Sequence, residues 1–132
     1  MTISAAMRQL ILTLGDVSAL VGSRVYVLML PQSFTPPAVR VQRIDESEPM
    51  HLRGRDELRR ARVQVDSVGS GGSVAEDVDA AIHAGLRGYQ GTVGDIDIHL
   101  IEPVTVRSMY DAAELKQYKV ARDYYVHYRD AA

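Results

Sequence analysis

The residues with the clearest chemical potential in this 132-residue chain are two acids, Asp95 and Asp97, beside a glycine-rich turn. Two carboxylates can share acid and base roles when their surroundings set their pKa values apart. These two lie at i and i+2 of one expected strand, and a solvated strand start explains them equally well. Ser67, Ser70 and Ser73 lack the Gly-x-Ser-x-Gly setting of a hydrolase nucleophile. We therefore assign no catalytic residue and expect a protein that is not an enzyme.

The histidines give only weak support for a metal site. None lies at His-x-x-x-His spacing, and no cysteine is present to join them. They are His51, His83, His99 and His127. His99 and His127 could face each other across neighbouring strands, but a polar strand face accounts for both. Because the absence of cysteine also excludes disulfides, thiolate catalysis and cysteine-based zinc sites, we expect no metal and no cofactor.

The strongest local charge is a run of five arginines within ten residues. The run consists of Arg53, Arg55, Arg59, Arg60 and Arg62. Arginine suits phosphate and carboxylate alike, so the run could contact a nucleic-acid backbone, an acidic neighbouring subunit or only solvent. Nearby acids nearly cancel its charge, and the formal net charge of the chain is -2. We favour a protein contact or a solvated loop, and keep a nucleic-acid-binding module using the Arg53–Arg62 loop as the alternative function.

Tyrosine is concentrated in the last quarter of the chain, from Tyr110 to Tyr128. Adjacent strand residues point to opposite faces, so Tyr124 and Tyr125 must place one ring on each face of a sheet. One ring can join the core, whereas the other needs a cover. A protein interface suits it, because tyrosine combines a large apolar area with a polar tip.

These residues are positioned by elements that the hydrophobic periodicity predicts. Apolar side chains at three- and four-residue spacing indicate a helix over residues 3–14, followed by a short turn over 16–22. A second helix is expected from 73 to 87, because Ser73 and Glu76 have the spacing of a capping box. Alternating patterns predict the strands. The strands cover residues 24–28, 38–46, 61–68, 96–106 and 118–128.

The expected element order is α-β-β-β-α-β-β. It predicts an α+β fold with a mostly antiparallel sheet of about five strands and two helices packed on one face. We expect a single domain over residues 1–132. Two connections, 47–60 and 107–117, exceed the usual length of ~4–6 residues, and such loops often bind something. The glycine-rich segment 69–73 is expected to be a strand-to-helix connection.

The composition is that of a globular protein. Hydrophobic residues make up 46% and charged residues 24%, which excludes wholesale disorder. No segment approaches the ~20 apolar residues of a membrane span, and the first residues do not resemble an export signal. We expect a soluble protein that is made in the cytoplasm and has no membrane partner.

Five segments, taken in their order and spacing, resemble the tail-completion or tail-terminator proteins of long-tailed bacteriophages. The first is an N-terminal helix that ends in Val-Ser-Ala-Leu-Val-Gly before Ser-Arg-Val-Tyr. The others are Pro-Pro-Ala-Val-Arg-Val-Gln-Arg-Ile, then Ala-Arg-Val-Gln-Val-Asp, then a helix ending Leu-Arg-Gly-Tyr-Gln-Gly, and the final Tyr-Lys-Val-Ala-Arg-Asp-Tyr-Tyr-Val-His-Tyr. The resemblance covers residues 17–128.

The resemblance implies an α+β subunit that forms a ring, typically a hexamer, on the head-proximal end of the phage tail. Such a ring caps the tail tube protein, ends tube polymerisation and presents a surface to the head-tail connector or stopper protein. DNA passes through its lumen without specific binding, and near-neutral charge suits that passage. The family implies a virion location, assembly in the host cytoplasm, no reaction and no cofactor.

A closed ring needs a heterologous interface, in which one patch meets a different patch on the next copy. We expect the arginine loop on one side of this contact, and the acidic or tyrosine-bearing segments on the other. The candidate contact residues are Arg53, Arg55, Arg59, Arg60, Tyr110, Asp111, Glu114 and Tyr125.

Overall fold

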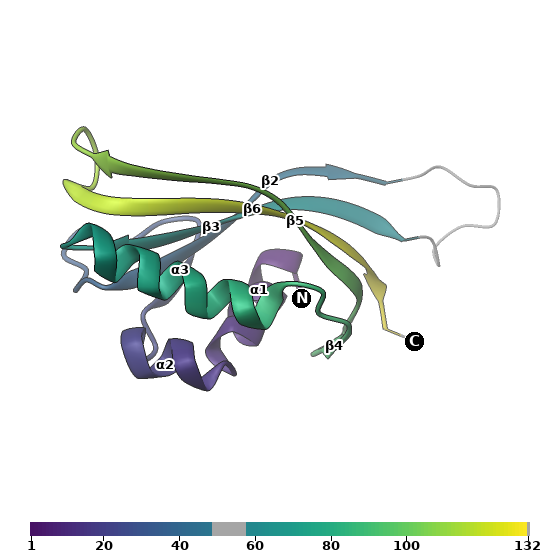
Figure 1. The fold of residues 1–132 in the computed structure, drawn as a ribbon. Helices are drawn as coiled ribbons and strands as arrows, with labels where there is room; N and C mark the ends of the chain where they lie inside the picture. Colours follow the sequence, from purple (N-terminus) through teal and green to yellow (C-terminus); the bar gives the residue numbers. More distant parts are fainter. Residues whose placement is uncertain (49–57, 132) are drawn as a thin grey trace.

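The structure is a computed structural model that describes residues 1–48 and 58–131. Over these residues the helices lie together on one side of a curved sheet (Figure 1). The helices are α1 (Ile3–Leu12), α2 (Gly15–Val21) and α3 (Gly72–Leu86). The strands are β1 (Val25–Val27), β2 (Ala38–Ser47), β3 (Arg59–Gly69), β4 (Gly91–Val93), β5 (Ile96–Asp111) and β6 (Gln117–Asp130). No helix within these two ranges is long and apolar enough to cross a membrane.

The sheet order is β1-β2-β3-β6-β5-β4. All neighbouring strands are antiparallel except β1 and β2, which are parallel. The prediction of an α+β fold with a mostly antiparallel sheet and helices on one face is confirmed. The expected two helices and about five strands are corrected to three helices and six strands in the described ranges. The short turn at 16–22 closes into helix α2, and the three-residue β4 is too short to show a periodicity.

The core lies between the helices and the inner face of the sheet. Helix α1 buries the predicted stripe that includes Met7 and Ile11, and α3 buries Val78 and Ile82. The strands supply β-branched side chains and the ring of Tyr124, which is fully buried. Val74 lies four residues before Val78 on this helix, but it is exposed at the first turn.

The beginning of α3 differs from the capping box that was predicted. The helix starts at Gly72, its N-cap is Gly71, and no side chain caps it. Ser73 therefore already lies inside the first turn. A Cβ atom at Gly69 would lie 3.1 Å from the backbone nitrogen of Ala75, so the glycines allow the end of β3 to approach the helix closely. Close backbone packing, rather than capping chemistry, explains this segment.

Most of the predicted loop 107–117 belongs to a long hairpin. Strand β5 continues to Asp111 and β6 begins at Gln117, which leaves a turn over residues 112–116. Alternation failed to reveal the end of β5 because both of its faces are exposed from Glu102 to Tyr110. The other expected loop is also shortened, because β2 reaches Ser47 and β3 begins at Arg59; residues 49–57 lie outside the described part of the chain.

Strand β5 changes its neighbours along its length. Between Ile96 and Ile98 it pairs with both β4 and β6. Ile101 then exchanges backbone hydrogen bonds with Gly88 and Tyr89. Beyond it, β5 pairs with β6 alone among the described residues. The pairing register shifts between Pro103 and Thr105, which interrupts the regular strand pairing at this proline.

Candidate subunit interface

The predicted arginine cluster divides between two parts of the chain. Arg53 and Arg55 lie outside the described residues, whereas Arg59 and Arg60 are the first residues of β3 instead of part of a loop. The Nη2 atom of Arg59 lies 2.8 Å from the Oδ1 atom of Asp130 on β6. Arg59 is therefore tied to the neighbouring strand of its own chain.

Tyr125 lies on the outer sheet face, the one opposite the helices, as its alternation with the buried Tyr124 predicts. The guanidinium carbons of Arg60 and Arg62 lie 4.4 and 5.8 Å from the centre of its ring. Part of the cover that we expected for Tyr125 thus comes from its own chain. Arg62 also places Nη2 2.8 Å from Asp123 Oδ2. This ion pair reduces the positive charge offered to a phosphate backbone, which counts against the nucleic-acid alternative.

A buried polar network occupies the outer face of the central strands. Arg40 Nη2 lies 2.7 Å from Asp66 Oδ2, and the side chain of Asp66 has no exposed surface. Gln64 donates a hydrogen bond of 2.7 Å to the other oxygen of this carboxylate. The predicted contact residue Glu114 approaches Arg40 at 3.7 Å. Glu114 also lines a surface cavity together with residues 29–32 and Phe34. Residues of the same chain therefore surround Glu114 at this end of the outer face.

The turn of the β5–β6 hairpin is organised by Asp111, another predicted contact residue. Its Oδ1 atom accepts a hydrogen bond of 2.9 Å from the backbone N–H of Glu114, and a longer one of 3.4 Å from Leu115. Lys119 places its ammonium 3.5 Å from Oδ2. These backbone donors, the one at Glu114 first, lower the pKa of Asp111. The carboxylate of Asp111 therefore organises the backbone of this turn.

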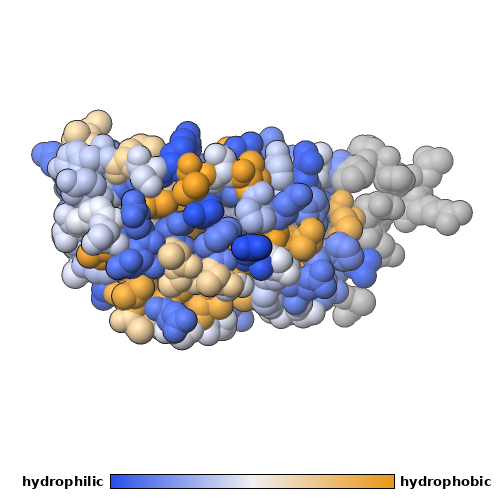
Figure 2. All heavy atoms as spheres, viewed as in Figure 1, coloured by the Kyte–Doolittle hydropathy of each residue, from blue (hydrophilic) through white to orange (hydrophobic). Residues whose placement is uncertain are grey.

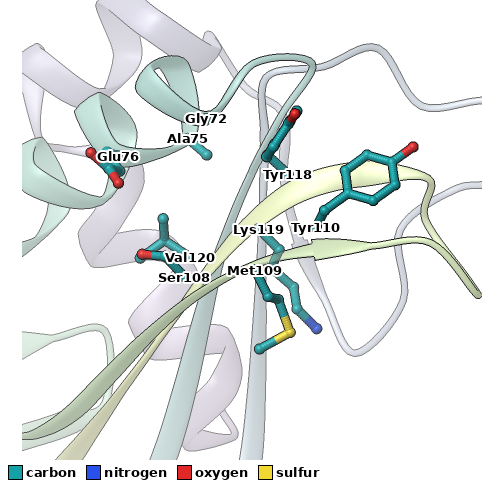
Figure 3. A pocket seen from close by; sticks show the side chains of 9 residues that line it. All are labelled: Gly72, Ala75, Glu76, Ser108, Met109, Tyr110, Tyr118, Lys119 and Val120. Atoms are coloured by element: carbon teal, nitrogen blue, oxygen red, sulfur yellow. The ribbon is translucent and has the colours of Figure 1, made fainter.

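Tyr110 and Tyr118 pack edge to face on the inner side of this hairpin, with ring centres 5.0 Å apart. Both rings stay largely exposed, at 53% and 42% of their surface. The pair borders a hollow of about 290 Å³ between the hairpin and the first turns of α3 (Figure 3). Glu76 lines the α3 side of this hollow. The sequence pointed to Tyr110 but not to the hollow, because the hollow depends on where α3 ends relative to the longer strands.

The exposed segment of β5 is the second part of the candidate interface. Every residue from Glu102 to Tyr110 is exposed, and Val104, Val106 and Met109 are large apolar members. Figure 2 shows hydrophobic side chains among hydrophilic ones on the face over which β5 runs. An exposed strand edge with apolar residues is a ready template for another chain. The sequence predicted a strand as far as residue 106 and a loop over 107–117, so the part of this edge beyond Val106 was missed.

The residues considered for catalysis and metal binding do not converge. Asp97 accepts a hydrogen bond of 2.6 Å from Thr92, and Asp95 lies 3.4 Å from the N-terminal amine. His127 lies 3.2 Å from Glu102, and a register shift beside His99 places Leu100 opposite His127. Within the part of the chain that the structure describes, no three potential metal ligands gather. His51 lies outside the described residues.

An exposed strand edge, an exposed tyrosine pair and a bordering hollow form the part of the described surface that best suits contact with another chain. The sequence profile of the tail completion protein gp17 family matches residues 5–125, and the chain belongs to this family. It is therefore a structural protein of the phage virion tail, as the resemblance predicted.

The fold is similar to that of a chain in a solved structure described as the virion of a native gene transfer agent particle. The TM-score is 0.76 with 16% sequence identity, over 96% of this chain and 94% of that chain. At this identity the similarity shows a shared fold. No curated protein sequence matched the chain.

Proposed function

We propose that the protein forms a ring, most simply a hexamer, that caps the head-proximal end of the tail tube. The ring ends polymerisation of the tube protein and then offers its free surface to the head-tail connector. The observation that carries this proposal is membership of the tail completion family over residues 5–125. The open edge of β5 supports it, because ring subunits need a surface that another copy can cover.

The charge of the chain suits a ring through which DNA must slide. The formal net charge is -2, and Arg59 and Arg62 are paired with Asp130 and Asp123. Tight DNA binding needs neutralisation of many phosphates by unpaired cations. We therefore propose a lumen that passes DNA without holding it.

The proposal is tested with tail tubes assembled from the tube protein of the same virion. Electron microscopy of tubes mixed with the protein should show added density at one end only, and tubes growing in its presence should stop lengthening. Light scattering should give a mass of six subunits, either alone or on the tube end. A protein that remains a monomer with tubes present, and leaves their ends bare and growing, would refute the proposal.

A further inference from the structure

The sheet has a free backbone edge at each of two opposite corners. Strand β1 pairs with β2 only as far as Val41, so residues 42–47 of β2 pair with β3 alone within the described ranges. On the other side of the sheet, residues 102–111 of β5 pair with β6 alone in the same ranges. The ends of β2 and β3 reach the right of Figure 1, whereas the β5–β6 turn lies at the left. The two free edges therefore lie on opposite sides and toward opposite ends of the sheet.

The path of the chain leaves both edges open. Leu28 follows β1 with φ of +70°, in the left-handed region that residues other than glycine rarely adopt. The backbone N–H of Met29 then donates to the carbonyl oxygen of Val27, so the chain turns instead of continuing along β2. On the other side, the cover of β5 ends at Ile101, which bonds to the segment after α3. An open strand edge is a template for a strand of another chain.

The strand directions allow one edge to receive the other. Strand β2 is antiparallel to β3, β3 is antiparallel to β6, and β6 is antiparallel to β5. Strand β2 therefore runs opposite to β5. A second copy that continues the sheet in the same orientation presents its β2 edge antiparallel to β5, like the other long pairs of the sheet.

The middle of the free β2 edge is an acid. Residues 42–47 lie opposite residues 60–64 of β3, and the middle of that span, Arg62, faces Asp45. Arg62 pairs in turn with Tyr125, so the side chain of Asp45 belongs to the outer face of the sheet. Asp45 is exposed.

The middle of the free β5 edge is a cation. Residues 102–111 lie opposite residues 117–125 of β6, and the middle of that span, Ala121, faces Arg107. Ala121 is four residues from Tyr125 on β6, so the side chain of Arg107 also belongs to the outer face. Arg107 is exposed and forms no ion pair within the described ranges.

These charges discriminate among the three ways in which two edges can meet. Two β2 edges centred on each other would bring Asp45 against its own copy, and two β5 edges would bring Arg107 against its own copy. A β2 edge centred on a β5 edge instead pairs the acid with the cation. Like charges directly opposite on neighbouring strands are destabilising, whereas opposite charges are stabilising.

Exposed apolar side chains lie on the same two edges. Ile44 is 50% exposed on β2, and Val104 and Val106 are 37% and 43% exposed on β5. A strand that adds to either edge removes part of this apolar surface from water, which favours the association.

We propose that the free β2 edge of one copy adds to the free β5 edge of the next copy, with Asp45 opposite Arg107 and Ser47 opposite Thr105. The occupant is a second copy, because the chain itself carries the strand direction and the charge that the β5 edge requires. The contact is heterologous, so repetition around an axis closes a ring whose sheets are joined edge to edge. This inference rests on the proposed ring and specifies which strands close it.

The chain contains no cysteine, so a pair of introduced cysteines reports the contact without a background. Ser47→Cys and Thr105→Cys are prepared as separate proteins, mixed under the conditions that form the ring, and oxidised. We expect a covalent dimer in the mixture and none from either variant alone, because opposed residues of antiparallel strands lie about 4.5–5.5 Å apart, within reach of a disulfide. A chain that carries both cysteines should give a ladder of cross-linked species that ends at the number of subunits in the ring.

The matched control replaces Thr105→Cys by Met109→Cys. Met109 is exposed on the same edge and the same face, but it lies four residues along β5, at a distance of about 13 Å. It should give no dimer with Ser47→Cys. Equal yields at the two positions would show that the edges meet without a fixed register, which contradicts the pairing of Asp45 with Arg107.

Each outcome of this experiment has a distinct meaning. A dimer from Thr105→Cys alone would show that two β5 edges face each other, which overturns the heterologous contact. A ring seen by microscopy without a cross-link in the mixture would overturn this inference and leave the proposed ring intact. Absence of any ring, with tubes present, would overturn the proposed function and this inference together.

Charge reversal provides an independent measurement. Arg107→Glu should raise the subunit concentration needed for half-maximal ring formation about tenfold, because each subunit of a ring takes part in two such contacts. Adding Asp45→Lys restores opposite charges and should recover most of the loss. Arg129→Glu is the control, because Arg129 is exposed on β6 away from both free edges, and its effect should stay below about twofold. A double variant that assembles no better than Arg107→Glu would contradict the pairing.

Discussion

Arg122 donates two hydrogen bonds to the carboxylate of Asp79, at 3.0 and 2.9 Å, and thereby fastens α3 to β6. Both side chains are mostly buried. A two-point guanidinium–carboxylate pair fixes orientation as well as distance. The helix borders the hollow at its first turns, so this pair also sets the width of the candidate interface.

Asp79→Ala should therefore destabilise the subunit. The change leaves the Arg122 guanidinium buried without its acceptor, which costs about 2–3 kcal/mol of unfolding free energy. Urea denaturation measures the loss. Asp77→Ala is the matched control on the same helix, because Asp77 is exposed, and it should change stability by less than about 0.5 kcal/mol. Equal effects of the two substitutions would contradict a structural role for the pair.

A pH dependence should arise at His83, whose Nδ1 atom lies 3.0 Å from the hydroxyl of Tyr124. Burial, and then the positive charge of Arg122, lower the pKa of His83 from 6.5. The unfolded chain therefore binds a proton more readily than the folded one. The contribution of His83 to stability is fully present above pH 6.5 and decreases as the pH falls below that value.

Thermal unfolding followed between about pH 7.5 and pH 5 should show this loss of stability. Most carboxylates stay ionised over this range, so histidines dominate the change in bound protons. His83→Gln should flatten the decline, because glutamine does not titrate. His127→Gln is the control, since His127 lies beside Glu102 on the outer face. A decline that is as steep in His83→Gln as in the parent would rule out this assignment.

The sequence predicted most of the helices and strands that build the core. It did not predict the exposed end of β5 or the hollow beside α3. Alternation placed Tyr124 and Tyr125 on opposite faces, and the structure confirms that one ring is in the core. It failed for β5 beyond Val106, because a strand that is exposed on both faces has no alternation of buried and exposed residues for its sequence to reveal. Leu28 and the Tyr118 side of the hollow were missed for a related reason. Their exposure depends on how far the helices extend across the sheet, which is a tertiary property.

The turn of the β5–β6 hairpin should depend on the carboxylate of Asp111. Asp111→Ala removes the acceptor for the backbone N–H groups of Glu114 and Leu115, so amide hydrogen exchange over residues 112–118 should accelerate. Asp111→Asn keeps a side-chain oxygen and loses only the charge facing Lys119, so its exchange should be intermediate. Exchange that stays unchanged in Asp111→Ala would show that strand pairing alone holds the turn.

The same carboxylate gives an acid dependence of known sign. Hydrogen bonding lowers the pKa of Asp111 below 3.8, so its contribution to stability is present above that value and is lost as the pH falls through the lower, folded value. Asp111→Asn should therefore narrow the difference in turn protection between about pH 5 and a pH below the folded pKa of Asp111. An identical acid response in the parent and Asp111→Asn would exclude this group as its source.

The buried pair of Arg40 and Asp66 allows a separate test of what holds the outer sheet face. Within the described ranges, Asp66→Ala leaves the Arg40 guanidinium with the more distant carboxylate of Glu114, at 3.7 Å, as its acidic partner. The substitution should cost about 3–5 kcal/mol. Replacing both partners, as Arg40→Met with Asp66→Leu, removes the uncompensated charge together with its acceptor. Such replacements of buried ion pairs are often neutral or stabilising, so the double variant should recover to within about 1 kcal/mol of the parent. Urea midpoints of the two variants measure the difference. A double variant as unstable as Asp66→Ala would mean that the polar network, including Gln64, contributes through its hydrogen bonds rather than through charge balance.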